Sequence, residues 1–230
     1  MAAVKLLRDP AELAAQYQAA DPFPHIVIDN LFEDAALDAV LAQFPTPQEM
    51  RSWLNFNSPH EKKLGFWHER SSVSDGIRHF LEAMNGFETL LFLEQLTGIE
   101  GLISDPYFAG GGPHQIEPGG YLKIHTDFNF HPKLKLDRRL NMLIYLNRDW
   151  REEWGGHLEL WDGELRACGQ RILPTFNRTV IFSTTDHSYH GHPHPLTSPA
   201  GVTRKSVSLY YYTAGRPEAE RSAPHDTIFA

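Results

Sequence analysis

The chain has 230 residues, 41% hydrophobic and 12% aromatic, so we expect one globular domain over residues 1–230 with a sizeable core. The net charge of −8 argues against a nucleic-acid partner, because phosphate contacts need clustered lysine and arginine. No apolar run approaches the roughly 20 residues that cross a bilayer, which argues against a membrane partner.

Cysteine content indicates the compartment. The single cysteine, Cys168, permits no internal disulfide, so we expect a reducing compartment and a cytoplasmic location. Residues 1–9 contain too short an apolar stretch for a secretory signal. The sequence does not indicate an oligomeric state.

The first hundred residues or so contain most of the expected helices. Asp9 and Pro10 open a helical pattern over 11–17, with proline at the first position. The β-branched residues at 26–28 predict a strand, and helical spacing returns at 34–44. Residues 75–98 predict two further helices.

Residues 45–74 carry proline, asparagine, serine and charge without a clear period, which predicts a long loop. Within it, residues 51–70 combine aromatic and basic side chains. Two interpretations stay open: a mobile lid that orders over a substrate, or an irregular loop packed on the helices.

The second half predicts short strands separated by Gly, Pro and Asn turns, which is typical of an antiparallel sandwich or barrel. Helices first and strands later indicate an α+β fold, with the N-terminal helices buttressing one sheet face. We place a helical part at about 1–100, a β core at about 101–213 and a tail at 214–230. The expected strands cover 121–127, 140–146, 157–161, 179–182 and 206–212.

The triplet His125-Thr126-Asp127 lies in one of these expected strands. Residues i and i+2 of a strand point to the same side, so His125 and Asp127 can reach one metal ion. A third ligand must come from elsewhere, and His187, His190, His192 and His194 are the candidates downstream. Two imidazoles and a carboxylate form a facial iron(II) site with open positions.

Several segments in order resemble the Fe(II)/2-oxoglutarate-dependent dioxygenases, specifically the prolyl-4-hydroxylase-like group, over roughly residues 100–213. The resemblance implies a double-stranded β-helix, or jelly-roll, core. The segments that carry it are Gly119-Gly120-Tyr121-Leu122-Lys123-Ile124-His125-Thr126-Asp127, residues 140–150, 154–160 and 177–182, His190-Gly191 and Arg204-Lys205-Ser206.

The resemblance implies that His125, Asp127 and His190 hold iron, with His190 favoured because Gly191 follows it. The co-substrate 2-oxoglutarate would chelate the iron, and its distal carboxylate would meet Arg204, with help from Tyr145 and Ser206. A guanidinium suits that carboxylate because it offers two parallel hydrogen bonds. Dioxygen is the second co-substrate, and ascorbate is a candidate reductant.

The implied reaction is hydroxylation of a C–H bond with release of succinate and carbon dioxide. The substrate is a peptidyl residue such as proline, or a small metabolite or sugar unit. An aspartate at 127 favours hydroxylation, since halogenases of this type have a small residue there. Two alternatives are a zinc hydrolase, because zinc accepts the same ligand types, and a non-catalytic jelly-roll binding module.

One position departs from the family pattern. Many members have a tyrosine three residues before the first ligand histidine, where this chain has Leu122. Tyr121 lies one step earlier and shares the strand parity of His125, so we expect it to point inward as a candidate cofactor-binding residue.

Strand parity predicts further orientations. Asn141 shares the parity of Tyr145 and is a candidate for the cofactor pocket, whereas Lys205 should point away from Arg204's side. Tyr210, Tyr211 and Tyr212 are interpreted as sheet-face residues. The candidates for lining a substrate pocket are His114, Gln115, Phe128, Asn129 and Trp161.

Overall fold

The computed structural model describes residues 4–67 and 72–230. The helices are α1 (Pro10–Gln18), α2 (Asp34–Leu41), α3 (Pro47–Trp53), α4 (Asp75–Met84) and α5 (Phe87–Thr97). Of these, α1, α2, α4 and α5 lie where helices were predicted. The first is capped by Asp9, whose side chain accepts from the Ala11 amide, with Pro10 at its first position.

The strands pair antiparallel, as the alternating sequence predicted. Their path runs in the order β1-β11-β8-β13-β5-β3-β6-β12-β9-β10, with four short strands attached to it. The strands are β1 (His25–Asp29), β2 (Leu54–Asn57), β3 (Glu61–Gly65), β4 (Ile103–Ser104), β5 (Gly112–Ile116), β6 (Tyr121–Thr126), β7 (Phe130–His131), β8 (Leu136–Tyr145), β9 (Leu158–Trp161), β10 (Cys168–Ile172), β11 (Arg178–Ser183), β12 (His190–His192), β13 (Arg204–Thr213) and β14 (Ile228–Phe229).

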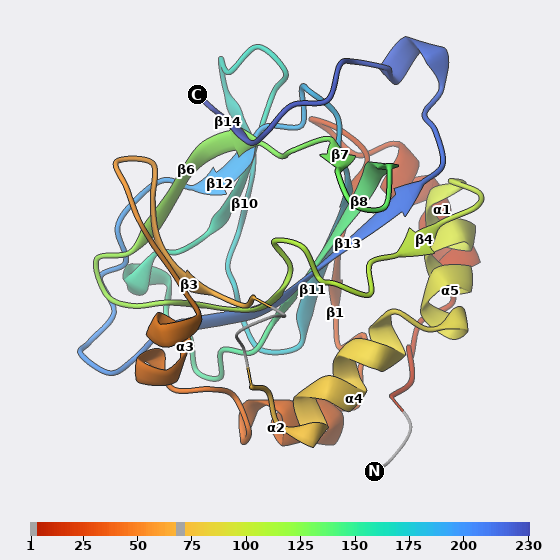
Figure 1. Ribbon diagram of the computed structural model, residues 1–230. Helices are drawn as coiled ribbons and strands as arrows, with labels where there is room; N and C mark the ends of the chain where they lie inside the picture. The colour runs from red at the N-terminus through yellow and green to blue at the C-terminus, as the bar shows by residue number, and fades with distance from the viewer. Residues whose placement is uncertain (1–3, 68–71) are drawn as a thin grey trace.

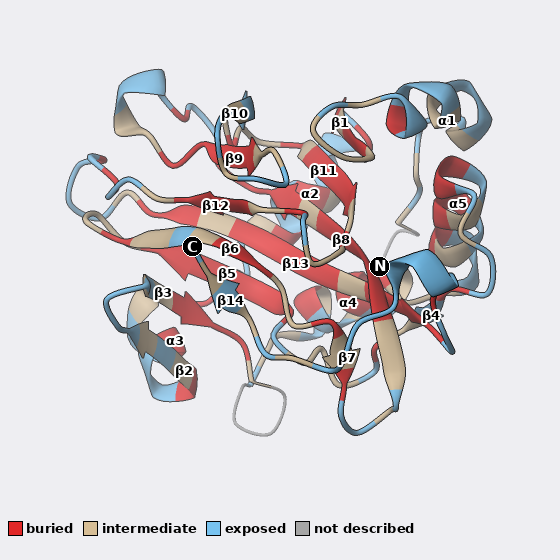
Figure 2. Ribbon diagram, turned by 90° about the horizontal axis from the view of Figure 1, so that it is seen from above, coloured by how far each residue is buried: buried red, intermediate tan, exposed pale blue. Residues whose placement is uncertain are grey.

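Strands β8 and β13 divide the interior into two environments, because successive side chains of a strand point to opposite faces. Leu140, Met142 and Ile144 of β8 pack with Val207 and Leu209 of β13 in the core shared with the helices. The alternate residues of both strands face a cavity inside the β-structure. Figure 2 shows these two strands as largely buried ribbons through the middle of the molecule.

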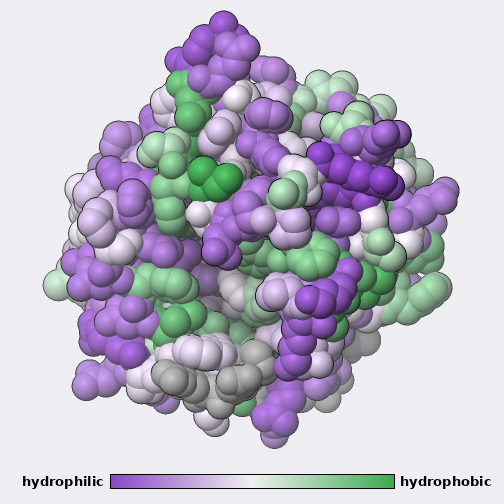
Figure 3. Space-filling model, turned by 45° about the horizontal axis from the view of Figure 1, so that its top comes forward, coloured by the Kyte–Doolittle hydropathy of each residue, from purple (hydrophilic) through white to green (hydrophobic). Residues whose placement is uncertain are grey.

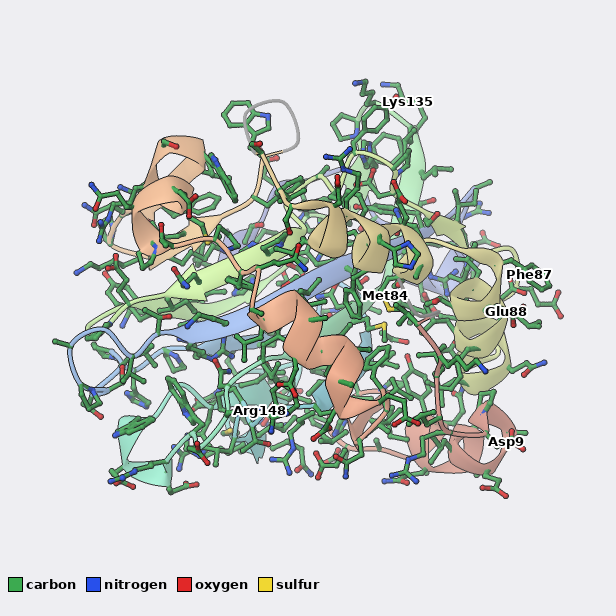
Figure 4. All side chains as sticks on the ribbon, turned by 90° about the horizontal axis from the view of Figure 1, so that it is seen from below. Asp9, Met84, Phe87, Glu88, Lys135 and Arg148 are labelled. Atoms are coloured by element: carbon green, nitrogen blue, oxygen red, sulfur yellow. The ribbon has the colours of Figure 1, made fainter. Side chains whose placement is uncertain are left out.

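Helices cover one side of this sheet, as predicted. In Figure 1, α1 and α5 lie together at one edge, while β6, β12 and β14 lie on the opposite side of the molecule. Met84, at the end of α4, points inward and is 1% exposed, whereas Phe87, at the start of α5, points outward and is 72% exposed (Figure 4). The inner side chains of the helices therefore pack into the core, while their outer side chains face solvent.

The predicted long loop over 45–74 is wrong for the residues that the structure describes. Thr46 and Glu49 form a capping box that starts α3, and β2 and β3 form a hairpin. Strand β3 pairs with β5 at one point and with β6 at another, so it bridges two parts of the sheet. The hairpin alternates half-buried and exposed side chains, mostly polar, so hydrophobic periodicity did not reveal it.

The lid interpretation concerned residues 51–70, of which 68–70 lie outside the described residues. Within 51–67, the chain forms the end of α3 and the hairpin rather than an irregular loop. Closure of this segment over a substrate stays a prediction.

The C-terminal segment returns to the β core. Ile228 and Phe229 of β14 pair with Thr126 and His125 of β6. The Phe229 ring lies 5.5 Å from the His125 ring and stacks on His60 at 4.7 Å. Part of the segment expected as a tail therefore packs beside the strand that carries the metal-ligand candidates.

Among the described residues, no helix has both the length and the apolar character needed to span a bilayer.

Candidate active site

Three predicted ligand residues converge inside the β-structure. His125 lies on β6, Asp127 follows that strand directly, and His190 begins β12 as the cross-strand partner of His125. Nε2 of His125 lies 3.6 Å from Oδ1 of Asp127, and Nε2 of His190 lies 3.4 Å from Oδ2. One candidate ligand atom from each of the three residues lies within 4.8 Å of the others. This spacing can hold one metal ion between two imidazoles and a carboxylate.

Backbone contacts orient both imidazoles. Nδ1 of His125 is 2.8 Å from the Lys123 carbonyl oxygen, and Nδ1 of His190 is 2.9 Å from the Ser188 carbonyl oxygen. A carbonyl only accepts, so each Nδ1 carries the proton and each Nε2 keeps its lone pair facing Asp127. Burial lowers the pKa of His190 to about 4, which keeps this imidazole neutral. A histidine whose Nε2 keeps its lone pair is ready for coordination.

Asp127 is ionised and held in place. Although burial opposes its charge, the Arg138 guanidinium holds the pKa of Asp127 well below the usual range. Its Oδ2 accepts from Asn141 at 2.7 Å and lies 3.0 Å from the Arg138 guanidinium. Two imidazoles plus one carboxylate suit iron(II) with open coordination positions, so the donor set fits this ion.

Arg138 is a site residue that the sequence analysis missed. It is 1% exposed, and Asn141 accepts from two of its nitrogens. Its guanidinium lies 3.5 Å from the Tyr210 ring centroid and 4.4 Å from that of Phe128. Tyr210 is therefore a cavity residue as well as a sheet residue, which the interpretation of the three tyrosines did not foresee. Arg138 falls outside the expected strand at 140–146, and the longer β8 brings it to the metal-ligand candidates.

A cavity of about 270 Å³ connects the three ligand candidates with Arg204, Tyr145 and Ser206. Arg204 is buried; its Nε donates to the Gly156 carbonyl oxygen at 2.8 Å and its Nη2 to the Tyr145 hydroxyl at 3.2 Å. None of the described acidic side chains forms an ion pair with it, and burial lowers the pKa of Arg204. A buried cation without an anionic partner is costly, so this end of the cavity fits a ligand carboxylate.

The expected inward orientation of Tyr121 is wrong. Its hydroxyl donates to the Ser58 carbonyl oxygen, while Leu122 lines the cavity instead. The cause is a bulge in β6. His190 of β12 pairs with His125, and His192 pairs with Leu122, so β6 has one more residue than β12 between the two pairs. An extra residue reverses strand parity beyond it, which simple alternation cannot foresee.

Asn141 and Lys205 point to the sides that strand parity predicted. Asn141 lines the cavity as expected, but its amide binds the Asp127 carboxylate rather than lying free for a co-substrate. Lys205 turns away from the cavity, and its Nζ donates to the Thr203 hydroxyl. Of the substrate-pocket candidates, His114 and Phe128 line the cavity, whereas Gln115, Asn129 and Trp161 do not.

The wall of the cavity also contains residues from two segments that the sequence analysis did not connect with the site. Glu61 and Lys63 reach it from the β2–β3 hairpin and pair with each other at 3.0 Å. Thr227 and Phe229 reach it from the C-terminal segment. Figure 3 shows hydrophilic and hydrophobic side chains mixed on one face of the molecule, around a shaded hollow. No local motif marked these residues, because they meet the site only through long-range pairing.

The alternative distal ligands occupy different environments. His194 is 78% exposed in its side chain and lies 3.9 Å from Glu159, and His187 is exposed. His192 lines the cavity, but it lies outside the group of residues able to hold one ion.

We expect His190→Ala to lose metal binding and His192→Ala to keep it, because only His190 presents Nε2 to Asp127. Titration of the metal-free variants with Mn(II) by calorimetry measures this. The loss of Mn(II) affinity in His190→Ala should be larger than the roughly 10- to 100-fold loss caused by removing a residue that only orients a ligand. If His192→Ala loses Mn(II) binding and His190→Ala keeps it, the distal ligand is His192.

Gly191 allows β12 to lie against β6. A Cβ at this position would lie 2.7 Å from the Lys123 carbonyl oxygen and 2.8 Å from that of Leu122. We expect Gly191→Ala to destabilise the fold by about 1–3 kcal/mol, since backbone atoms must shift. Thermal unfolding measures the loss, with Gly215→Ala as control because nothing lies within 4 Å of its Cβ. Equal unfolding midpoints for the two variants would contradict this reason for the glycine.

Comparisons with known proteins agree with this geometry. Residues 111–212 match the family model described as the 2OG-Fe(II) oxygenase superfamily. No curated protein matches the chain in sequence. A prolyl-4-hydroxylase structure from Pseudomonas putida is 16% identical, covers 90% of this chain and 100% of its own, and has a TM-score of 0.63.

Two further solved structures are similar. A prolyl hydroxylase from Trichoplax adhaerens, in complex with a hypoxia inducible factor peptide fragment, is 16% identical over 88% of each chain, with a TM-score of 0.60. HygX from Streptomyces hygroscopicus, with nickel, 2-oxoglutarate and hygromycin B bound, is 10% identical over 94% of this chain and 96% of its own, with a TM-score of 0.57. At these identities the likeness shows the fold, and it confirms the predicted jelly-roll.

Proposed function

We propose that this chain, of which residues 111–212 match the 2OG-Fe(II) oxygenase superfamily model, is an oxygenase that hydroxylates a C–H bond of one peptidyl residue or of a small metabolite. The observation that carries this proposal is one cavity with two ends. At one end lie His125, Asp127 and His190, and at the other lies the buried, unpaired Arg204.

His125, Asp127 and His190 would hold iron(II), since two imidazoles and one carboxylate are the donor set that suits this ion. Bound iron and 2-oxoglutarate supply the oxidising power from dioxygen, with succinate and carbon dioxide as the co-products. Asn141 and Arg138 hold the Asp127 carboxylate in position from its Oδ2 side. A carboxylate at this position completes the ligand set of a hydroxylase.

Arg204, Tyr145 and Ser206 bind the distal carboxylate of 2-oxoglutarate. Arg204 is oriented by the Gly156 carbonyl and the Tyr145 hydroxyl, so its guanidinium is positioned before the co-substrate enters. Burial raises the pKa of Tyr145, so its hydroxyl stays protonated and available as a donor. The apolar side chains of Ile116, Leu143 and Leu158 in the same cavity exclude water from this pair.

The substrate reaches the iron past Phe128, Arg138 and Tyr210, which form a cationic and aromatic wall on the Asp127 side. The cavity of about 270 Å³ must also admit the co-substrate, so we expect one side chain or a small molecule to enter it. The similar structures hold a peptide fragment in one case and hygromycin B in the other, so both substrate classes remain in the proposal.

Succinate formation from 2-oxoglutarate under air tests the function. We expect it to require iron(II), to be supported by ascorbate as reductant, and to stop when Zn(II) replaces iron. Hydrolytic activity that depends on zinc would support the zinc hydrolase instead. Failure to bind 2-oxoglutarate in the presence of Mn(II) would favour a non-catalytic binding module.

The single Cys168, which is unpaired, supports the proposed cytoplasmic location.

A further inference from the structure

We propose that His192 is an additional 2-oxoglutarate-binding residue, whose imidazole N–H donates a hydrogen bond to the distal carboxylate that Arg204 binds. This inference rests on the proposed function and adds a residue that neither the ligand set nor the Arg204 pair includes. The distal carboxylate would then accept hydrogen bonds from residues on both walls of the jelly-roll.

The position of His192 supports this role. It ends β12 two residues after His190, and both side chains line the same cavity as Arg204. Gly156, whose carbonyl oxygen accepts from Arg204, shares a second, smaller pocket with His192. His192 therefore lines the same cavity as the guanidinium, on the β6–β12 side.

The imidazole of His192 has unused hydrogen-bonding capacity. The residue is 4% exposed, and neither ring nitrogen has a hydrogen-bond partner within the described parts of the chain. A neutral imidazole always carries one N–H donor, and buried donors without partners are rare in folded proteins. A ligand in the cavity would supply the missing acceptor.

The charges around His192 favour an anionic acceptor. His192 lines the same cavity as the basic side chains of Arg204 and Lys63. Lys63 is already paired with Glu61 at 3.0 Å, whereas Arg204 has no acidic partner among the described residues. An anion that satisfies Arg204 is therefore the acceptor within reach of His192.

The neighbouring strand places an apolar side chain next to His192. Its cross-strand partner on β6 is Leu122, which lines the cavity with an apolar side chain. Tyr145 and Ser206 approach from the β8 and β13 side. A carboxylate has two oxygens with several acceptor sites, so donors from opposite walls can bind it together.

Three variants of the full chain test the inference. We expect His192→Leu, which keeps the volume but removes the donor, to weaken 2-oxoglutarate binding roughly 10- to 100-fold. His192→Gln, which restores an N–H donor, should recover most of the affinity. His194→Leu is the matched control, because His194 is exposed and lies two residues further along the chain. The readout is the Kd for 2-oxoglutarate, measured by calorimetry on the Mn(II)-loaded protein without turnover.

A second probe separates carboxylate binding from other effects. The keto acid 2-oxopentanoate has the same metal-chelating end as 2-oxoglutarate but lacks the distal carboxylate. We expect His192→Leu to bind it as the unchanged protein does, and Mn(II) affinity and thermal unfolding to stay unchanged.

The outcomes that overturn the inference are distinct. Equal weakening for both keto acids would mean that His192 acts through the metal ligands or the fold. Unchanged 2-oxoglutarate affinity in His192→Leu would mean that ordered water satisfies the imidazole. If the unchanged protein binds Mn(II) but no 2-oxoglutarate, the proposed function itself fails, together with this inference.

Discussion

Asp127→Ala is expected to abolish 2-oxoglutarate turnover, because the variant lacks the only carboxylate in the group able to hold iron. The substitution also leaves Arg138 buried beside an empty position, 1% exposed and without its anionic partner. Breaking a buried ion pair from one side costs about 3–5 kcal/mol of folding free energy. Succinate formation and chemical unfolding of the metal-free protein measure the two effects separately.

A double variant distinguishes chemistry from folding in this experiment. Asp127→Ala combined with Arg138→Met removes the unpaired charge, so we expect it to recover much of the stability but none of the turnover. Asp137→Ala is the control carboxylate, since Asp137 lies at the start of β8 and does not line the cavity. Turnover in the stable double variant would show that the carboxylate is not a required ligand.

Arg204→Ala is expected to raise the Kd for 2-oxoglutarate by roughly 10- to 150-fold, which corresponds to the loss of a charge-assisted hydrogen bond of about 1.5–3 kcal/mol. Turnover at saturating 2-oxoglutarate should fall much less, because Arg204 binds the end of the co-substrate that does not react. Co-substrate dependence of succinate formation gives the KM, and calorimetry on the Mn(II)-loaded protein gives the Kd.

Lys205→Ala provides the matched control for charge. The two cations are neighbours on β13, but Lys205 points to the other face and binds Thr203. Removing it should leave the KM for 2-oxoglutarate unchanged. Equal effects of the two substitutions would indicate general electrostatic attraction of the dianion, and an unchanged KM in Arg204→Ala would remove Arg204 from its role.

Local patterns predicted most of the helices and the strands β1, β6, β8, β9, β11 and β13, since their signals lie within a few residues. Strand parity placed Asn141 on the side of Tyr145 and Lys205 away from Arg204, and the structure shows both orientations. His125 and Asp127 followed from the same two-residue period. The register of β12 against β6 brings His190 to them, and no local pattern contains that register.

The sequence by itself determined which residue types could bind a metal and a dicarboxylate, because that chemistry belongs to the side chains. Only the tertiary structure decided which wall each side chain joins. The bulge in β6 turned Tyr121 away and Leu122 inward, while the extension of β8 brought Arg138 to Asp127. The β2–β3 hairpin and the C-terminal segment completed the cavity from distant parts of the chain. Such placements depend on pairing between remote strands, whose free energy comes from packing the whole barrel rather than from local preference.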